Sequence, residues 1–188
     1  AGIRAACASR LRRERGRGPA ARREFVERLR AAPLAEQVEK ANEQHYEVPP
    51  EFFRLVLGPR LKYSSCLWPD GVDTLPAAED AMLALYGERA QLADGQDILE
   101  LGCGWGSLTL WMAQNYPRSH ITAVSNSKPQ REFILGRCRT LGLGNVEVVT
   151  QDVNRLELRT SSFDRCVSIE MFEHMRNYAT LLERIASW

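Results

Sequence analysis

Residues 98–108 read Ile-Leu-Glu-Leu-Gly-Cys-Gly-Trp-Gly-Ser-Leu, and this segment constrains the fold more than any other. The apolar run contains one acidic residue, Glu100, and then breaks into three alternating glycines, Gly102, Gly104 and Gly106. Glycine has no Cβ atom, so these residues can adopt a positive φ and let the backbone lie against a ligand. A dinucleotide-binding turn would need a further glycine at Ser107, so NAD and FAD fit poorly. The segment predicts a buried strand, a ligand-cradling turn and a helix, or a glycine-rich turn without a ligand.

Strands and helices are expected to alternate after Gly95. The expected strands are 97–101, 120–124, 146–150 and 163–169, and the expected helices are 107–115, 128–141 and 177–187. These strands are almost continuously apolar, which is typical of a parallel sheet covered on both faces. Right-handed crossovers would place their carboxyl ends at one edge, where such sheets bind ligands. We therefore predict an α/β fold and divide the chain into a basic helical arm (1–32), a helical cap (33–93) and the sheet (94–188).

Within the cap, we expect a helix over residues 34–43, a short helix that begins at Pro50, and a longer helix capped by Thr74 that runs to about Leu92. The arm has a net charge of +7 and the remainder of the chain −6. The arm has one aromatic residue and no nucleic-acid-binding motif follows it, so a solvated appendage is favoured over nucleic-acid binding.

The five cysteines are scattered without C-x-x-C pairs or nearby histidine pairs. This spacing predicts neither a metal site nor a disulfide framework, and reduced thiols fit a cytoplasmic protein. No apolar stretch approaches the roughly 20 residues that span a bilayer, so no transmembrane segment is expected.

Four further segments carry recognisable motifs. The first two read Asn-Glu-Gln-His-Tyr-Glu-Val-Pro-Pro-Glu-Phe-Phe at 42–53 and Leu-Lys-Tyr-Ser-Ser-Cys at 61–66. The third is Ser-Asn-Ser at 125–127, followed by Gln130, and the fourth is Ser-Ile-Glu-Met-Phe-Glu-His at 168–174. With the glycine turn, they resemble the class I S-adenosylmethionine (SAM) methyltransferases with a Rossmann-like sheet. Within that class they are most similar to the cyclopropane-fatty-acid-synthase-like enzymes, and there to the coclaurine N-methyltransferase type. The resemblance runs from about Glu36 to the last residue and implies SAM as the cofactor.

The predicted cofactor-binding residues lie around the glycine turn. Glu100 and the Gly102 carbonyl would suit the ammonium of SAM, and the resemblance implies that Tyr63 and Ser64 hold its carboxylate. The second strand ends without an acid, and the resemblance implies that Gln130 contacts the ribose instead, beside Ser125 and Asn126. The alternative for Gln130 is an ordinary helix position. Asp152, followed by Val153, could accept a hydrogen bond from the amino group of adenine, or could cap a helix or turn. His45 is expected to close a lid over the cofactor or to be a packing residue.

The catalytic prediction rests on Glu170, Glu173 and His174. If this segment is helical, Glu170 and His174 share a face, and the resemblance implies that Glu173 and His174 orient and deprotonate an amine. A surface ion pair at a helix start is the alternative. The lipid-modifying relatives have cysteine where this chain has Ser65 and glycine where it has Glu170. Both departures favour a small-molecule amine over a fatty-acyl phospholipid as the methyl acceptor. A third hypothesis is an inactive module that only binds SAM.

The sequence reaches Trp188 in the helix after the fourth expected strand, whereas a complete class I sheet has seven strands. We therefore expect this segment to be truncated, with residues 163–169 at an open edge that favours self-association. Useful methyl transfer by these 188 residues alone is not expected. Peripheral lipid contact stays open.

Overall fold

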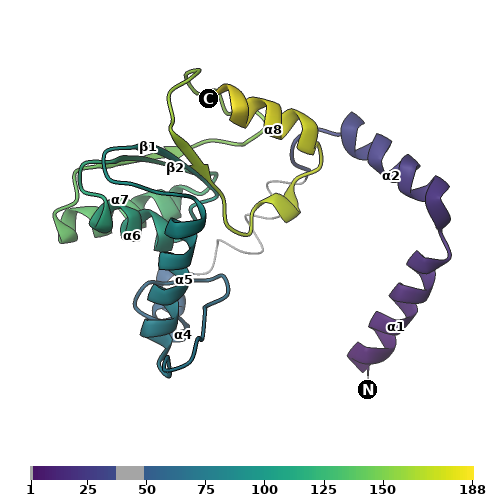
Figure 1. The fold of residues 1–188 in the computed structure, drawn as a ribbon, viewed down its shortest axis with the longest axis horizontal. Helices are drawn as coiled ribbons and strands as arrows, with labels where there is room; N and C mark the ends of the chain where they lie inside the picture. The colour runs from purple at the N-terminus through teal and green to yellow at the C-terminus, as the bar shows by residue number, and fades with distance from the viewer. Residues whose placement is uncertain (1, 37–48) are drawn as a thin grey trace.

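A computed structural model of the chain describes residues 2–36 and 49–188. Four parallel strands form its sheet in the order β3-β2-β1-β4. Their bounds are β1 Asp97–Leu101, β2 His120–Ser125, β3 Val146–Thr150 and β4 Arg165–Val167. Figure 1 shows the sheet at the centre of the body, with helices on both sides. The predicted covered parallel sheet is confirmed.

The helices of this part are α6 Ser107–Asn115, α7 Lys128–Leu141 and α8 Tyr178–Ser187. The bounds of β1, β3, α6 and α7 are those predicted. Strand β4 is shorter than predicted. At Ser168 the contact with β1 passes from backbone to side chain, because the Ser168 hydroxyl donates to the Leu101 carbonyl at 2.9 Å.

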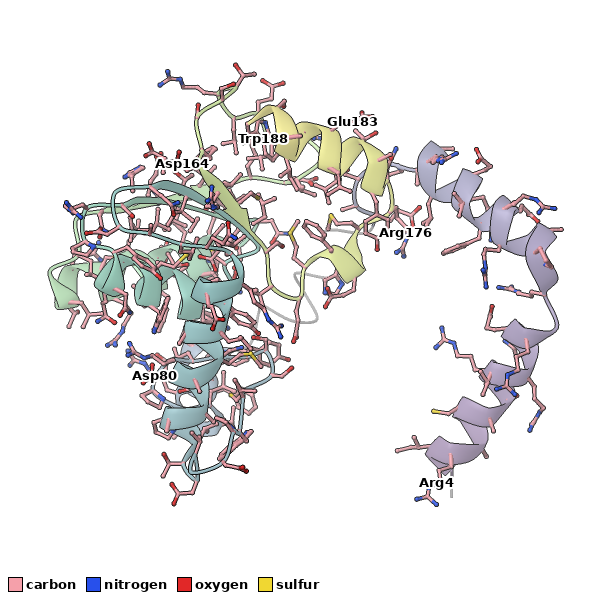
Figure 2. The ribbon with its side chains drawn as sticks, in the orientation of Figure 1. Arg4, Asp80, Asp164, Arg176, Glu183 and Trp188 are labelled. Atoms are coloured by element: carbon pink, nitrogen blue, oxygen red, sulfur yellow. The ribbon has the colours of Figure 1, made fainter. Side chains whose placement is uncertain are left out.

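The core lies on both faces of β1. On one face, Ile98 packs with Met112 of α6 and with the cap, and α7 covers β2 and β3 on the same side. On the other face, Leu99 and Leu101 pack against Leu156 and against Trp188, the residue that ends α8 and is labelled in Figure 2. Apolar packing on both faces explains the almost continuous apolar sequence of this strand.

The cap contains α4 Pro50–Val56 and α5 Leu75–Arg89. Helix α4 begins where predicted. Helix α5 ends three residues earlier than expected. Thr74 occupies its N-cap position, as predicted, but its side chain forms no cap hydrogen bond. The predicted helix over 34–43 is also wrong at its start. There Ala35 forms an antiparallel bridge with Met175, a pairing made by chain folding rather than local sequence; residues 37–43 lie outside the described residues.

The basic arm contains two helices, α1 Gly2–Arg15 and α2 Gly18–Ala31, and neither helix has a buried residue. Figure 1 shows both helices leading away from the sheet, with the end of α2 beside α8. The arm is fastened there, because Asn177 Nδ2 donates to the carbonyls of Arg30, at 2.7 Å, and Ala32, at 3.2 Å. Among the described residues, no helix combines the length and apolar character needed to cross a membrane.

Candidate functional site

A cavity of about 280 Å³ lies at the carboxyl ends of the strands. Three segments close around it: the glycine turn, the cap loop at 61–64 and the chain after β4 at 169–175. Most of the predicted site residues line it: Tyr63, Ser64, Glu100, Gly102, Gly104, Ser125, Asn126, Gln130, Val153, Glu170, Glu173 and His174. Gly106 and Asp152 are not among the lining residues, and His45 lies outside the described residues.

The three glycines of the turn all have positive φ, at 82°, 52° and 81°, but for different reasons. A Cβ atom on Gly102 would lie 2.9 Å from that of Met171, and one on Gly106 would lie 2.7 Å from Ile134 Cγ1. These two glycines therefore allow close packing of protein against protein. A Cβ on Gly104 would meet no protein atom within 4 Å. Gly104 lines the cavity, so it is the glycine whose missing side chain leaves room for a ligand.

Glu100 carries a carboxyl group that is almost fully buried, with 3% of the residue exposed. The Thr109 hydroxyl donates to its Oε2 at 2.5 Å. Burial raises the pKa of Glu100 to about 8, although the hydrogen bond from Thr109 opposes the shift. A cationic group entering the cavity would stabilise the ionised form. Glu100 is thus suited to recognise an ammonium.

Gln130, the predicted ribose contact, is buried at the start of α7 with 2% exposure. Its Oε1 accepts from the Ser125 hydroxyl at 2.6 Å, and its backbone N–H donates to Ser127, the N-cap residue, at 3.4 Å. Its Nε2 has no hydrogen-bond partner among the described residues, nor has Ser107 Oγ. Both residues line the cavity, and unpaired buried polar atoms are costly unless a ligand pairs with them. These two atoms fit the hydroxyl-rich part of a nucleoside.

Asp152, the predicted adenine contact, is engaged in a turn. Its Oδ1 accepts from the backbone N–H of Asn154 at 2.9 Å and from the Asn154 side chain at 3.0 Å. Asn154 in turn bonds both backbone groups of Ala35, at 3.0 and 3.1 Å. The turn-capping alternative therefore describes the contacts of Asp152, whereas the adjacent Val153 and Gln151 line the cavity.

The segment after β4 is not the helix expected from Glu170 to His174, so the predicted shared helical face is wrong. Glu170 has a φ of 52°, and a single 3-10 turn, η1, covers Phe172–His174. The left-handed residue interrupts any helix that would include it. Instead, Ser65 donates its backbone N–H and its hydroxyl to Glu170 Oε1, at 3.4 and 3.3 Å. Glu170, Glu173 and His174 nevertheless all line the cavity.

Two features of the site were not predicted from the sequence. One is Trp105, which lines the cavity and packs between the cap and α7. Its ring centroid lies 5.1 Å from that of Phe53 and 5.4 Å from that of Phe133, neither of which lines the cavity. The position of Trp105 between two glycines was the sequence feature that could have indicated it. The other is Lys62, which is 4% exposed and lines the cavity. No signal marked it, because lysine in a loop is ordinarily solvated.

The described residues contain no group of three or more His, Cys, Asp or Glu side chains arranged to hold a metal ion. Two cysteines lie near the cavity, and neither is an activated thiol. Burial raises the pKa of Cys103 well above its ordinary value, and burial likewise raises that of Cys66.

Comparisons with known proteins agree with this geometry. Residues 34–187 match the family of mycolic acid cyclopropane synthetase. The chain is 46% identical over 160 residues to (S)-coclaurine N-methyltransferase of Thalictrum flavum subsp. glaucum, an alignment that covers 85% of this chain and 44% of that protein. It is 37% identical over 139 residues to the cyclopropane-fatty-acyl-phospholipid synthase of Escherichia coli K12, covering 73% of this chain and 34% of that enzyme.

A crystal structure of coclaurine N-methyltransferase bound to N-methylheliamine and S-adenosylhomocysteine (SAH) superimposes with a TM-score of 0.84 at 44% identity. The match covers 88% of this chain and 48% of that one. The chain therefore spans about half the length of these relatives or less.

Proposed function

Because the chain belongs to the mycolic acid cyclopropane synthetase family, we propose that the protein binds SAM in the cavity beside β1 and transfers its methyl group to a small-molecule amine. The contact between Ser65 and Glu170 carries the choice of an amine. These are the two positions that depart from the lipid-modifying pattern, and together they hold a carboxylate at the cavity wall. The similarity to coclaurine N-methyltransferase supports the same choice. Five free thiols support a reducing compartment such as the cytoplasm.

The residues present fit SAM on three observations. The buried Glu100 and the Gly102 carbonyl offer a site for the ammonium, with Tyr63 and Ser64 as the predicted contacts of the carboxylate. The unpaired Nε2 of Gln130 would pair with a ribose hydroxyl, with Ser125 and Asn126 beside it. Gly104 leaves free space, and Val153 offers an apolar surface to the adenine. Asp152 would act on adenine only if it left its turn with Asn154.

Three side chains would prepare the acceptor. When bound, SAM supplies a methyl group on a positively charged sulfur. The carboxylate of Glu170 would attract the protonated amine, and Glu173 with His174 would hold it and accept its proton, which later passes to water. The nitrogen lone pair is then free to form the new N–C bond while the S–C bond electrons return to sulfur. Alignment within a closed cavity accounts for much of the rate of such a displacement.

The proposal is tested in the full-length protein by offering radiolabelled SAM with a panel of secondary and tertiary amines, and separately with unsaturated phospholipid vesicles. Label in an amine product supports it. Label only in lipid would reverse the choice of acceptor in favour of the cyclopropane-synthase chemistry of the E. coli relative. SAH binding without transfer to any acceptor would favour the inactive SAM-binding module.

A further inference from the structure

Lys62 is a buried cation in the cap loop with no role in the mechanism above. Its Nζ donates to the Ser64 hydroxyl, by a short hydrogen bond, and to the Tyr86 hydroxyl at 3.2 Å. The same Nζ lies 4.8 Å from the centroid of the Tyr86 ring. No carboxylate of the described residues lies within the 4.0 Å that defines an ion pair with this ammonium. Burying a cation without an anion is costly, so this arrangement is suited to a ligand that brings one.

The backbone of Lys62 is fixed by a second buried group. Glu79 of α5 is fully buried, and its two carboxylate oxygens accept the backbone N–H groups of Arg60, at 3.0 Å, and Lys62, at 3.1 Å. A Cβ atom on Gly58 would collide with that carboxylate, so the loop closes tightly around it. The ammonium is therefore held in place before any ligand arrives, which limits the entropy lost on binding.

The charges of the cavity wall then separate by sign. Among the described lining residues, Lys62 is the one lysine or arginine, whereas four residues carry acidic side chains: Glu36, Glu100, Glu170 and Glu173. A zwitterionic amino-acid end would accordingly place its ammonium toward Glu100 and its carboxylate toward Lys62. Ser64, a predicted carboxylate contact, accepts directly from the Lys62 ammonium.

We propose that Lys62 is a cofactor-binding residue, whose ammonium pairs with the carboxylate of SAM and holds the Ser64 hydroxyl in position to donate to the same group. The inference rests on the proposed function. Tyr63 and Ser64 were the predicted contacts of the SAM carboxylate, and the inference adds Lys62 to them. Charge-assisted hydrogen bonds are the stronger kind, so the loss should be readily measured.

Equilibrium binding of two ligands to Lys62→Met tests this. SAH carries the carboxylate, and 5′-methylthioadenosine keeps the nucleoside and sulfur but lacks the amino-acid end. We expect Lys62→Met to weaken SAH binding by roughly 10- to 100-fold and to leave 5′-methylthioadenosine binding within about twofold. Lys62→Arg should restore part of the SAH affinity. Lys128→Met, an exposed lysine that does not line the cavity, is the matched control and should bind both ligands normally.

The outcomes separate this inference from the function on which it rests. An equal loss for both ligands would reduce Lys62 to a residue that maintains the loop, and unchanged SAH affinity in Lys62→Met would remove it from the site. Either result overturns the inference and leaves the SAM site in place. Failure of the unsubstituted protein to bind SAH would overturn the proposed function and the inference together.

Discussion

Ser65 and Glu170, 105 positions apart, are joined by two hydrogen bonds to a single carboxylate oxygen. The bonds connect the cap loop to the segment that follows β4, across the rim of the cavity. A glycine at position 170 could make neither bond. The pair therefore links the shape of the cap to the charge presented to an acceptor.

Glu170→Gly should lower kcat/KM for an amine acceptor by roughly 10- to 100-fold, because a charge-assisted contact with the amine is lost. A glycine tolerates the φ of 52° without strain, so the fold should be retained. SAH affinity should stay within about twofold. Glu183→Gly, in the exposed part of α8, is the control for loss of a carboxylate. If Glu170→Gly turned over the amine normally, this carboxylate would have no part in acceptor binding.

Gly104→Val should abolish measurable SAH binding, because the branched side chain would enter the space that Gly104 leaves free. Gly142→Val is a matched control. Gly142 also has a positive φ, at 67°, and nothing within 4 Å of its would-be Cβ, but it ends α7 away from the cavity. Both variants should lose similar stability, roughly 1–2 kcal/mol from the left-handed backbone. Calorimetry with SAH should then separate them, and equal affinity would rule out Gly104 as a cofactor contact.

Glu100 should release a proton when a cationic amino group binds. With a pKa of about 8 it is mostly protonated at pH 7, and pairing with an ammonium favours the carboxylate. Titrations of SAH at pH 7 in buffers of different ionisation enthalpy should therefore show release of up to roughly one proton. Glu100→Gln should bind more weakly and lack this component. Identical proton release from both proteins would assign the proton elsewhere.

The raised pKa of Glu100 also determines whether the folded protein gains or loses stability as the pH rises. A carboxyl with a raised pKa binds more protons in the folded than in the unfolded chain, so its contribution favours folding least at high pH. The free energy of unfolding of the ligand-free protein should fall as the pH rises from 4.5, the ordinary pKa of a glutamate, toward about 8, the raised pKa of Glu100. Urea titrations should show that Glu100→Gln flattens this decline. A decline of the same slope in both proteins would contradict the assignment.

In the full-length protein, Glu173→Gln and His174→Ala should lower kcat by roughly 10²- to 10⁴-fold, the usual range for general-base catalysis. Both residues line the cavity on η1, and neither is buried. SAH affinity should barely move, which separates chemistry from cofactor binding. Turnover at the unsubstituted rate in both variants would leave the pair as a surface feature of the 3-10 turn.

Local sequence was enough to predict the sheet and most of its helices. Three alternating glycines after an apolar run leave few other structures possible, so β1 and α6 were predicted to the residue. The left-handed conformation of Glu170 could not be predicted, because it depends on a contact with Ser65 across 105 positions. The same holds for Lys62, whose burial depends on Glu79 and Tyr86 of a separate helix. Sequence pattern was therefore enough for the strands and the glycine turn, whereas tertiary contacts decide the conformation of Glu170 and the burial of Lys62.

The two hydrogen bonds between Asn154 and Ala35 carry a consequence for the order of folding. They close a loop of 119 positions, and the bond between Asn177 and Arg30 closes one of 147. Loop closure on that scale follows, rather than precedes, the formation of a local nucleus. A ribosome delivers residues 30–36 first, yet they must wait for β3 and α8 before they can dock. The part of the cavity wall that is synthesised earliest is therefore expected to dock only after the sheet and α8 have formed.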